Sequence, residues 1–95
     1  MREQGTLTGE WGTYTGEILN GQSYGKGKAI FSDGSLYEGD FVNGFFHGKG
    51  VFTWSDLVRT YIGNFVDGEI HGYGKLLKYG NVIYEGNWTK GKPGY

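Results

Sequence analysis

A fixed spacing of tyrosines constrains this chain more than any other feature. Four tyrosines follow one another at intervals of 23, 24 and 23 residues: Tyr14, Tyr37, Tyr61 and Tyr84. Each is followed by glycine two and seven positions later, and the first three also by glycine eleven and thirteen positions later. A period of this length is typical of array proteins, in which one small structural unit is repeated and packs against its neighbours.

Each unit has the pattern of a β-hairpin. From Tyr37 to Phe41, aromatic residues alternate with acidic ones, which places rings on one face of a strand and carboxylates on the other. Asn43-Gly44 then supplies the two positive-φ residues of a type I′ turn. Equivalent pairs occur in the neighbouring units at Asn20-Gly21 and Asp67-Gly68. Between units, turns are predicted at Gly9-Glu10, Asp33-Gly34 and Gly80-Asn81, and a protruding loop with exposed Leu57 and Val58 at residues 55–60.

Hairpins joined in this way predict an all-β fold, a single-layer antiparallel sheet of seven or eight strands. Glycines at fixed sites in adjacent strands predict that the sheet curves and that rings lie over bare backbone. Residues 1–13 are expected to form a tail, frayed over residues 1–4, and a partial capping repeat with a strand at Thr6–Thr8. The repeat domain is expected at 14–95, divided into 14–36, 37–60, 61–83 and a partial unit, 84–95, in which Pro93-Gly94 prevents a return strand.

Composition limits the classes of function. Glycine accounts for 20 of the 95 residues, but these glycines follow the repeat, and 18% aromatic residues are too many for a disordered chain. The absence of cysteine excludes disulfides and thiol chemistry. No stretch resembles a signal peptide or a transmembrane segment, so we expect a soluble, cytoplasmic protein. Nine basic and ten acidic residues give a net charge of −1, which offers no general attraction for nucleic acid.

The combined pattern resembles a known family. Tyr-x-Gly-x-aromatic, an Asn-Gly turn, and His-Gly-x-Gly-x-aromatic recur over residues 14–91, and this is similar to the MORN repeat (membrane occupation and recognition nexus). The resemblance implies an elongated, curved and twisted sheet of hairpins with a groove on its concave side, and the sequence leaves open which aromatic face is the concave one. Ile18 departs from the pattern, because later units have an aromatic residue there. The groove is therefore expected to be best formed at residues 37–76.

The candidate binding site is the set of aromatic columns that the repeat generates. These rings have two interpretations: they are ordinary packing of the sheet, or, because one layer leaves a side of them open, they line a groove that binds a partner. We predict the groove, with Tyr and Trp as anchors, at the following residues: Tyr14, Phe31, Tyr37, Phe41, Phe52, Trp54, Tyr61, Phe65, Tyr84 and Trp88. In this scheme Phe31, Phe52 and Leu76 form one column.

Metal, cofactor and catalytic sites are not predicted. His47 and His71 occupy matching positions two strands apart, about 9.6 Å, which is too far to share a zinc ion. Hydrogen bonding at the start of a strand is the expected role of both histidines. The sequence lacks a phosphate-binding loop in a strand-to-helix context, and its carboxylates are expected on a solvated face opposite lysines. We therefore expect no enzymatic activity.

The sequence favours a non-enzymatic binding module, or adaptor, that docks a partner peptide or amphipathic helix along the aromatic groove. Two alternatives remain open. One is binding to phosphoinositide or another anionic membrane surface, which the family name implies and the basic C-terminal residues Lys75, Lys78, Lys90 and Lys92 would assist. The other is a structural role in a cytoskeletal or ciliary assembly, with homo-dimerisation through unpaired sheet edges.

Overall fold

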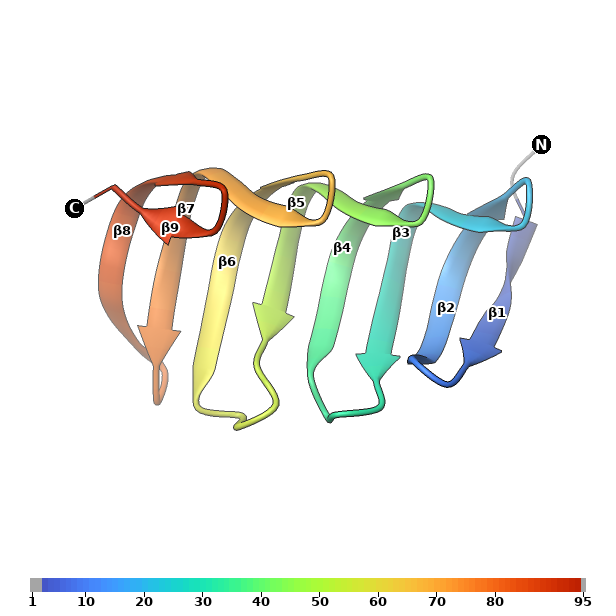
Figure 1. Cartoon of the computed structure of the whole chain (residues 1–95), viewed down its shortest axis with the longest axis horizontal. Coiled ribbons are helices and arrows are strands. Elements are labelled where there is room, and N and C mark those ends of the chain that lie inside the picture. The colour runs from blue at the N-terminus through green and yellow to red at the C-terminus, as the bar shows by residue number, and fades with distance from the viewer. Residues whose placement is uncertain (1–2, 95) are drawn as a thin grey trace.

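The sheet contains every regular element that the structure describes. A computed structural model describes residues 3–94, and these form one open antiparallel sheet of nine strands in sequential order (Figure 1). The strands are β1 (Glu3–Gly9), β2 (Gly12–Leu19), β3 (Gln22–Phe31), β4 (Leu36–Val42), β5 (Phe45–Thr53), β6 (Arg59–Val66), β7 (Glu69–Lys78), β8 (Asn81–Thr89) and β9 (Lys92–Pro93). The prediction of an elongated all-β array is confirmed, with nine strands where seven or eight were expected.

The connections between strands differ on the two long sides of the sheet, where the strands begin and end. The turns within the repeats lie on one long side, and the links between repeats lie on the other (Figure 1). Within the second repeat, Asn43 and Gly44 have φ values of 48° and 86°, the left-handed pair that the sequence predicted. The turn before β8 was predicted one residue too late. The positive-φ pair there is Tyr79-Gly80, and Asn81 already belongs to the strand.

Both ends of the sheet differ from the sequence-based expectation. The first strand begins at Glu3, so the frayed end predicted for residues 1–4 is wrong for Glu3 and Gln4, and residues 1–2 lie outside the described part. The turn that follows is at Glu10-Trp11 instead of Gly9-Glu10. Near the other end, the two-residue strand β9 pairs Pro93 with Trp88. Pro93 therefore does not prevent a return strand, because β9 is an outer strand of the sheet within residues 3–94, where a missing N–H is tolerated.

The link between β5 and β6 is the predicted protruding loop. Leu57 is exposed and has a φ of 60°, whereas Val58 is half-buried, contrary to expectation. Asp56 organises the loop, because its Oδ1 accepts hydrogen bonds from the backbone N–H groups of Val58 and Arg59 at 2.9 and 3.3 Å. The Arg59 guanidinium lies 5.0 Å from the centre of the Trp54 ring, a cation–π contact.

Glycine on one strand makes room for tyrosine on the next. In the second repeat Tyr37 pairs with Phe52 and Gly39 with Gly50, so the Tyr37 ring extends along its strand and lies over Gly50. A methyl group at Gly50 would come within 2.2 Å of the Tyr37 hydroxyl oxygen. Tyr14 over Gly27 and Tyr61 over Gly74 repeat this arrangement. The close approach explains why these positions of the repeat are glycine.

Aromatic rings from successive repeats form a continuous edge-to-face chain across the sheet. Tyr37 contacts Phe41 of its own repeat at 5.0 Å and Phe65 of the next at 5.1 Å, with interplanar angles of 82° and 86°. The chain runs through Tyr14, Phe41, Tyr37, Phe65, Tyr61, Trp88 and Tyr84. Edge-to-face pairs contribute about 0.5–1.5 kcal/mol each beyond area burial. This chain gives a single-layer sheet its core.

Candidate functional site

All ten residues predicted from the sequence lie in one cluster on one side of the sheet, which we call the aromatic face. Six are buried, with 5% or less of their surface exposed: Tyr14, Tyr37, Phe41, Tyr61, Phe65 and Trp88. Four are partly buried and pack against these six: Phe31, Phe52, Trp54 and Tyr84. The repeat therefore brings the predicted residues together, while their role in binding stays a prediction.

The burial of the tyrosines differs from the expectation that one side of the rings is open. Tyr37 and Tyr61 are completely buried and Tyr14 is 2% exposed. Tyr37 is covered by Phe46, which stacks on it with ring centres 3.9 Å apart and an interplanar angle of 8°, whereas Tyr14 packs edge-to-face against Phe41 at 4.8 Å. Tyr37 is thus the floor of the aromatic face, and a partner would contact the partly buried rings that surround it.

Phe46 is the central residue that the sequence analysis missed. It also contacts Phe41, Phe52 and Phe65, with ring centres 5.7, 6.0 and 5.6 Å away. Two signals were available in the sequence. Phe46 lies an even number of positions from Phe52 on the same strand, so both point to one face. The second signal is the repeat itself: Phe46 stands nine residues after its tyrosine, the position that Ser23 and Ile70 occupy in the neighbouring repeats.

One predicted column of aromatic residues was assigned in the wrong register. The structure pairs Tyr14 with Ala29, Tyr37 with Phe52 and Tyr61 with Leu76. Ala29, and not Phe31, is therefore the counterpart of Phe52 and Leu76. Phe31 lies two residues further along and corresponds to Trp54.

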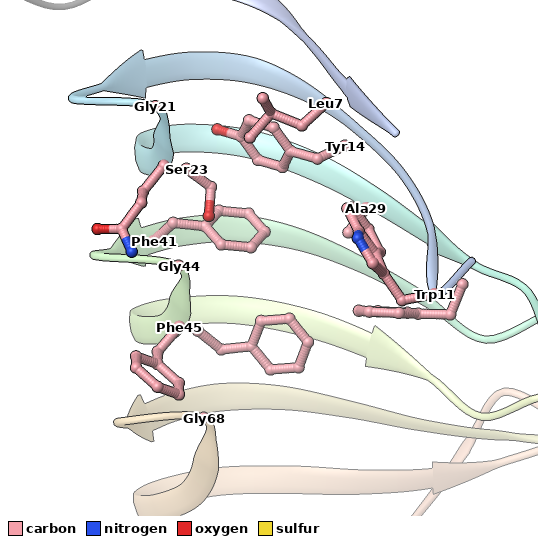
Figure 2. A pocket seen from close by; sticks show the side chains of 13 residues that line it. Leu7, Trp11, Tyr14, Gly21, Ser23, Ala29, Phe41, Gly44, Phe45 and Gly68 are labelled. Carbon is pink, nitrogen blue, oxygen red and sulfur yellow. The ribbon is translucent and has the colours of Figure 1, made fainter. Parts of the chain in front are cut away.

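The aromatic face is hollowed over the first repeat. An open depression of about 500 Å³ lies between Tyr14, Phe41 and Phe46, with Ser23 and Ala29 in its wall (Figure 2). Trp11, in the turn between β1 and β2, borders it at one end and Phe45 at the other. The lining also includes Leu7, Gly21, Gln22, Phe31, Gly44 and Gly68. None of these side chains carries a charge.

The hydroxyl groups of the buried tyrosines point along the sheet to the backbone. Tyr14, Tyr37 and Tyr61 donate hydrogen bonds of 2.6, 2.8 and 2.9 Å to the carbonyl oxygens three residues ahead. Burial raises the pKa of all three, most strongly that of Tyr37, to which the nearby Asp40 carboxylate adds. The phenols therefore remain neutral structural donors at physiological pH.

The two histidines connect neighbouring repeats. His47 Nδ1 accepts a hydrogen bond from the backbone N–H of Asp67 at 3.4 Å, and His71 Nδ1 accepts one from Lys90 at 3.2 Å. Beside them, the amides of Gly68 and Gly91 donate to the carbonyl oxygens of the preceding repeat, at Phe46 and Ile70. The predicted hydrogen-bonding role is confirmed, and its partner is the turn of the next repeat. Across residues 3–94, no three His, Asp or Glu side chains lie close enough together to hold a metal ion.

Charges concentrate on the opposite face of the sheet. Lys26 forms an ion pair with Asp40 at 2.5 Å, and the strand register places Lys28 opposite Glu38 and Lys75 opposite Glu85. Tyr73 on this face donates a hydrogen bond to Glu85, which raises the Tyr73 pKa. The expected cross-strand pairing of opposite charges is present as an ion pair between Lys26 and Asp40 and as matching strand register at the other two positions.

Comparison with known proteins identifies the repeat. The family model for the MORN repeat matches residues 14–36, 37–57, 61–79 and 84–94, which together cover most of the chain. The comparison with curated proteins gives no match. MORN repeats form a non-catalytic module family that generally mediates protein or membrane interactions and is often associated with membranes or the cytoskeleton. No helix within residues 3–94 has the length and apolar character needed to cross a bilayer.

Proposed function

We propose that this chain, which belongs to the MORN-repeat family, is a non-enzymatic adaptor that docks a segment of a partner protein along its aromatic face. The observation that carries the proposal is the contrast between the buried and the partly buried rings of the aromatic face. Tyr14, Tyr37 and Tyr61 are buried and hold the sheet together, whereas the rings beside them on the same face, Phe31, Phe52 and Trp54, remain partly accessible. Accessible aromatic rings on a rigid support are the usual anchors of protein interfaces.

The rigidity of the support favours this function. Every strand from β2 to β8 is paired on both sides, at least in part, and the rings between them are fixed by edge-to-face contacts. A partner that docks on such a surface loses its own conformational freedom but does not have to order the sheet.

We place the protein in the cytoplasm, where such a docking surface would meet its partner and where a chain without cysteine needs no oxidising environment.

Binding to an anionic membrane ranks second because three lysines on the opposite face are compensated, although Lys49 lies opposite Asn64. Lys26, Lys28 and Lys75 each lie beside a carboxylate, so they leave little net positive charge there to attract lipid phosphates. The same compensation argues for protein recognition through the apolar side of the sheet. A structural role in a larger assembly would instead use the outer edges of the terminal strands β1 and β9, which are unpaired within residues 3–94.

A display library of 16-residue peptides selected on the immobilised chain tests the proposal. Enriched peptides are then measured against two variants of the aromatic face, Phe31→Lys and Trp54→Lys, and against Ile62→Lys. Ile62 is 42% exposed and lies on the opposite face, because its neighbour Tyr61 points into the core. Circular dichroism confirms that each variant is folded before binding is measured.

The expected result is a loss of affinity of tenfold or more for the aromatic-face variants and less than twofold for Ile62→Lys. Sedimentation with phosphatidylcholine vesicles, with and without phosphoinositide, is run in parallel at low salt. Equal binding of the peptides to all folded variants would contradict the proposal. Phosphoinositide-dependent sedimentation without any enriched peptide would replace it with membrane binding.

A further inference from the structure

The first repeat lacks two bulky side chains that the later repeats possess. Nine residues after the tyrosine, the repeats have Ser23, then Phe46 and Ile70. Fifteen residues after it, they have Ala29, then Phe52 and Leu76, and the strand register confirms that these three are equivalent. The hollow over the first repeat lies where the missing side chains would be (Figure 2).

The hollow has the size and chemistry of a site for apolar groups. Its volume is about 500 Å³, whereas a cavity of about 150 Å³ is enough to hold benzene. Its lining contains no Asp, Glu, Lys, Arg or His side chain, and Leu7, Tyr14, Phe41 and Phe46 supply apolar surface. A charged group placed there would lose its hydration without gaining a partner.

We infer that this hollow is the anchor point of the docking surface and takes two bulky apolar side chains, Phe, Leu or Ile, from one turn of a partner's amphipathic helix. The inference rests on the proposed function, because it names the occupant of the same face. The repeat itself defines the occupant: the side chains that fill the equivalent space in the second repeat are Phe46 and Phe52. The two apolar side chains of the partner helix would pack beside Ser23 and Ala29 and against Trp11.

A helix fits this position better than an extended strand. The strands beneath the hollow, β2 to β5, are hydrogen-bonded to neighbours on both sides, so their main chains offer no free ladder to an added strand. An extended segment lying across the face would bury its own N–H and C=O groups without partners. A helix satisfies those groups internally and presents only side chains to the hollow.

The spacing of the missing side chains also matches a helix. Phe46 and Phe52 have ring centres 6.0 Å apart. Side chains three or four positions apart on a helix start from Cβ atoms about 5–6 Å apart on one face, so two parallel rings carried there can lie at a comparable separation. A partner helix with apolar residues at positions i and i+4 would therefore reproduce the pair.

The test uses synthetic helical peptides of about 16 residues, held helical by a side-chain cross-link on the face away from the hollow. The probe carries Phe at positions i and i+4 on an otherwise Ala-rich face. One control peptide has both Phe residues replaced by Ala. A second control keeps both Phe residues but contains proline at alternate positions, which prevents a helix. Affinities are measured by isothermal titration calorimetry, and the site is located by amide chemical-shift changes in the wild-type chain.

Two variants of the protein complete the test. Ser23→Phe fills the hollow with the residue that the second repeat carries, and Ala29→Leu fills it from the neighbouring strand position. The matched control is Val51→Phe, which adds the same ring on the opposite face, where Val51 is 38% exposed. Thermal unfolding checks that the variants fold.

We expect the di-Phe helix to bind at least tenfold more tightly than either control peptide, with shift changes at Leu7, Tyr14 and Phe41. Ser23→Phe or Ala29→Leu, whichever folds, should weaken binding at least tenfold, and Val51→Phe less than twofold. Unchanged affinity in a filled variant, with shifts confined to the second and third repeats, overturns the anchor site but leaves docking on the aromatic face intact. Equal binding of the proline peptide overturns the helical occupant. If the di-Phe helix does not bind although display yields aromatic-face binders, the stated chemistry of the occupant is wrong.

Discussion

The first and second repeats have the same backbone and the same tyrosine-over-glycine contact, yet their outer layers differ. In the second repeat, Phe46 stacks on Tyr37 and fills the space above it. In the first, Ser23 takes that position and a hollow remains beside Tyr14. The repeat thus combines two features: the inner tyrosine and glycine build the sheet, and the outer positions decide whether the space above the tyrosine is filled by a ring or left as a hollow.

The largest expected difference concerns the glycines beneath the tyrosines. A methyl group at Gly50 or Gly27 meets the hydroxyl oxygen of Tyr37 or Tyr14 at the same 2.2 Å. Tyr37 is enclosed by Phe41, Phe46 and Phe65 and cannot move aside, so we expect Gly50→Ala to cost about 3 kcal/mol of unfolding free energy or more. Tyr14 can shift toward the hollow, and Gly27→Ala should cost about 1 kcal/mol.

Urea unfolding, followed by tryptophan fluorescence, gives the unfolding free energy of both glycine variants. The dependence of that free energy on urea concentration should equal that of the wild type, which confirms that only stability changes. Val51→Ala, on the exposed opposite face, serves as the control and should lie within about 0.5 kcal/mol of wild type. Equal losses for Gly50→Ala and Gly27→Ala would show that the hollow gives Tyr14 no freedom to adjust.

A second prediction converts the closed repeat into an open one. Phe46→Ala removes the stack on Tyr37 and the contacts with Phe41 and Phe65, and should cost about 2–3 kcal/mol, somewhat less than for a fully buried ring. Its neighbour Phe45 is 55% exposed, so Phe45→Ala should change stability by less than about 0.5 kcal/mol. Thermal and urea unfolding of both variants give the two values. Similar losses for the two neighbours would mean that Phe46 does not complete the core of its repeat.

The repeat and its turns could be predicted from the sequence because they depend on local patterns. Asn43-Gly44 needs positive φ at both residues wherever it occurs in a hairpin, and the period of the tyrosines placed all ten candidate residues in one cluster. How deeply each residue of that cluster is buried could not be predicted in the same way. Whether Tyr37 is open or covered depends on Phe46, on a neighbouring strand, and on Phe65 in the next repeat.

The hollow could not be predicted from local sequence patterns either. The substitutions that create it, Ser23 and Ala29, are visible in the sequence once the repeats are aligned in the correct register. Alignment on Phe31 instead of Ala29 concealed them, since both residues belong to one strand and have the same parity. The actual volume depends further on Trp11, which lies in the turn before β2 and whose ring packs against Phe31 on the adjacent strand β3, with ring centres 6.1 Å apart.

The smallest expected difference between the repeats appears at alkaline pH. Burial raises the pKa of Tyr37 above its usual value more strongly than that of Tyr14. Below about pH 10 both phenols are neutral in the folded and unfolded chains, so neither makes stability depend on pH. Above pH 10 the unfolded chain releases protons that the folded chain keeps, and stability must fall as pH rises through the folded pKa values.

Replacing the phenol removes its share of this alkaline loss. Tyr37→Phe and Tyr14→Phe each lose one hydrogen bond to a carbonyl oxygen and should cost about 1 kcal/mol at pH 8. Between pH 8 and pH 11, however, both variants should lose less stability than the wild type. The difference from the wild type should be larger for Tyr37→Phe than for Tyr14→Phe. Urea midpoints at the two pH values measure the difference. If both variants flatten the pH dependence equally, the phenol of the closed repeat is no more desolvated than that of the open one, and the two repeats differ only in their outer layer.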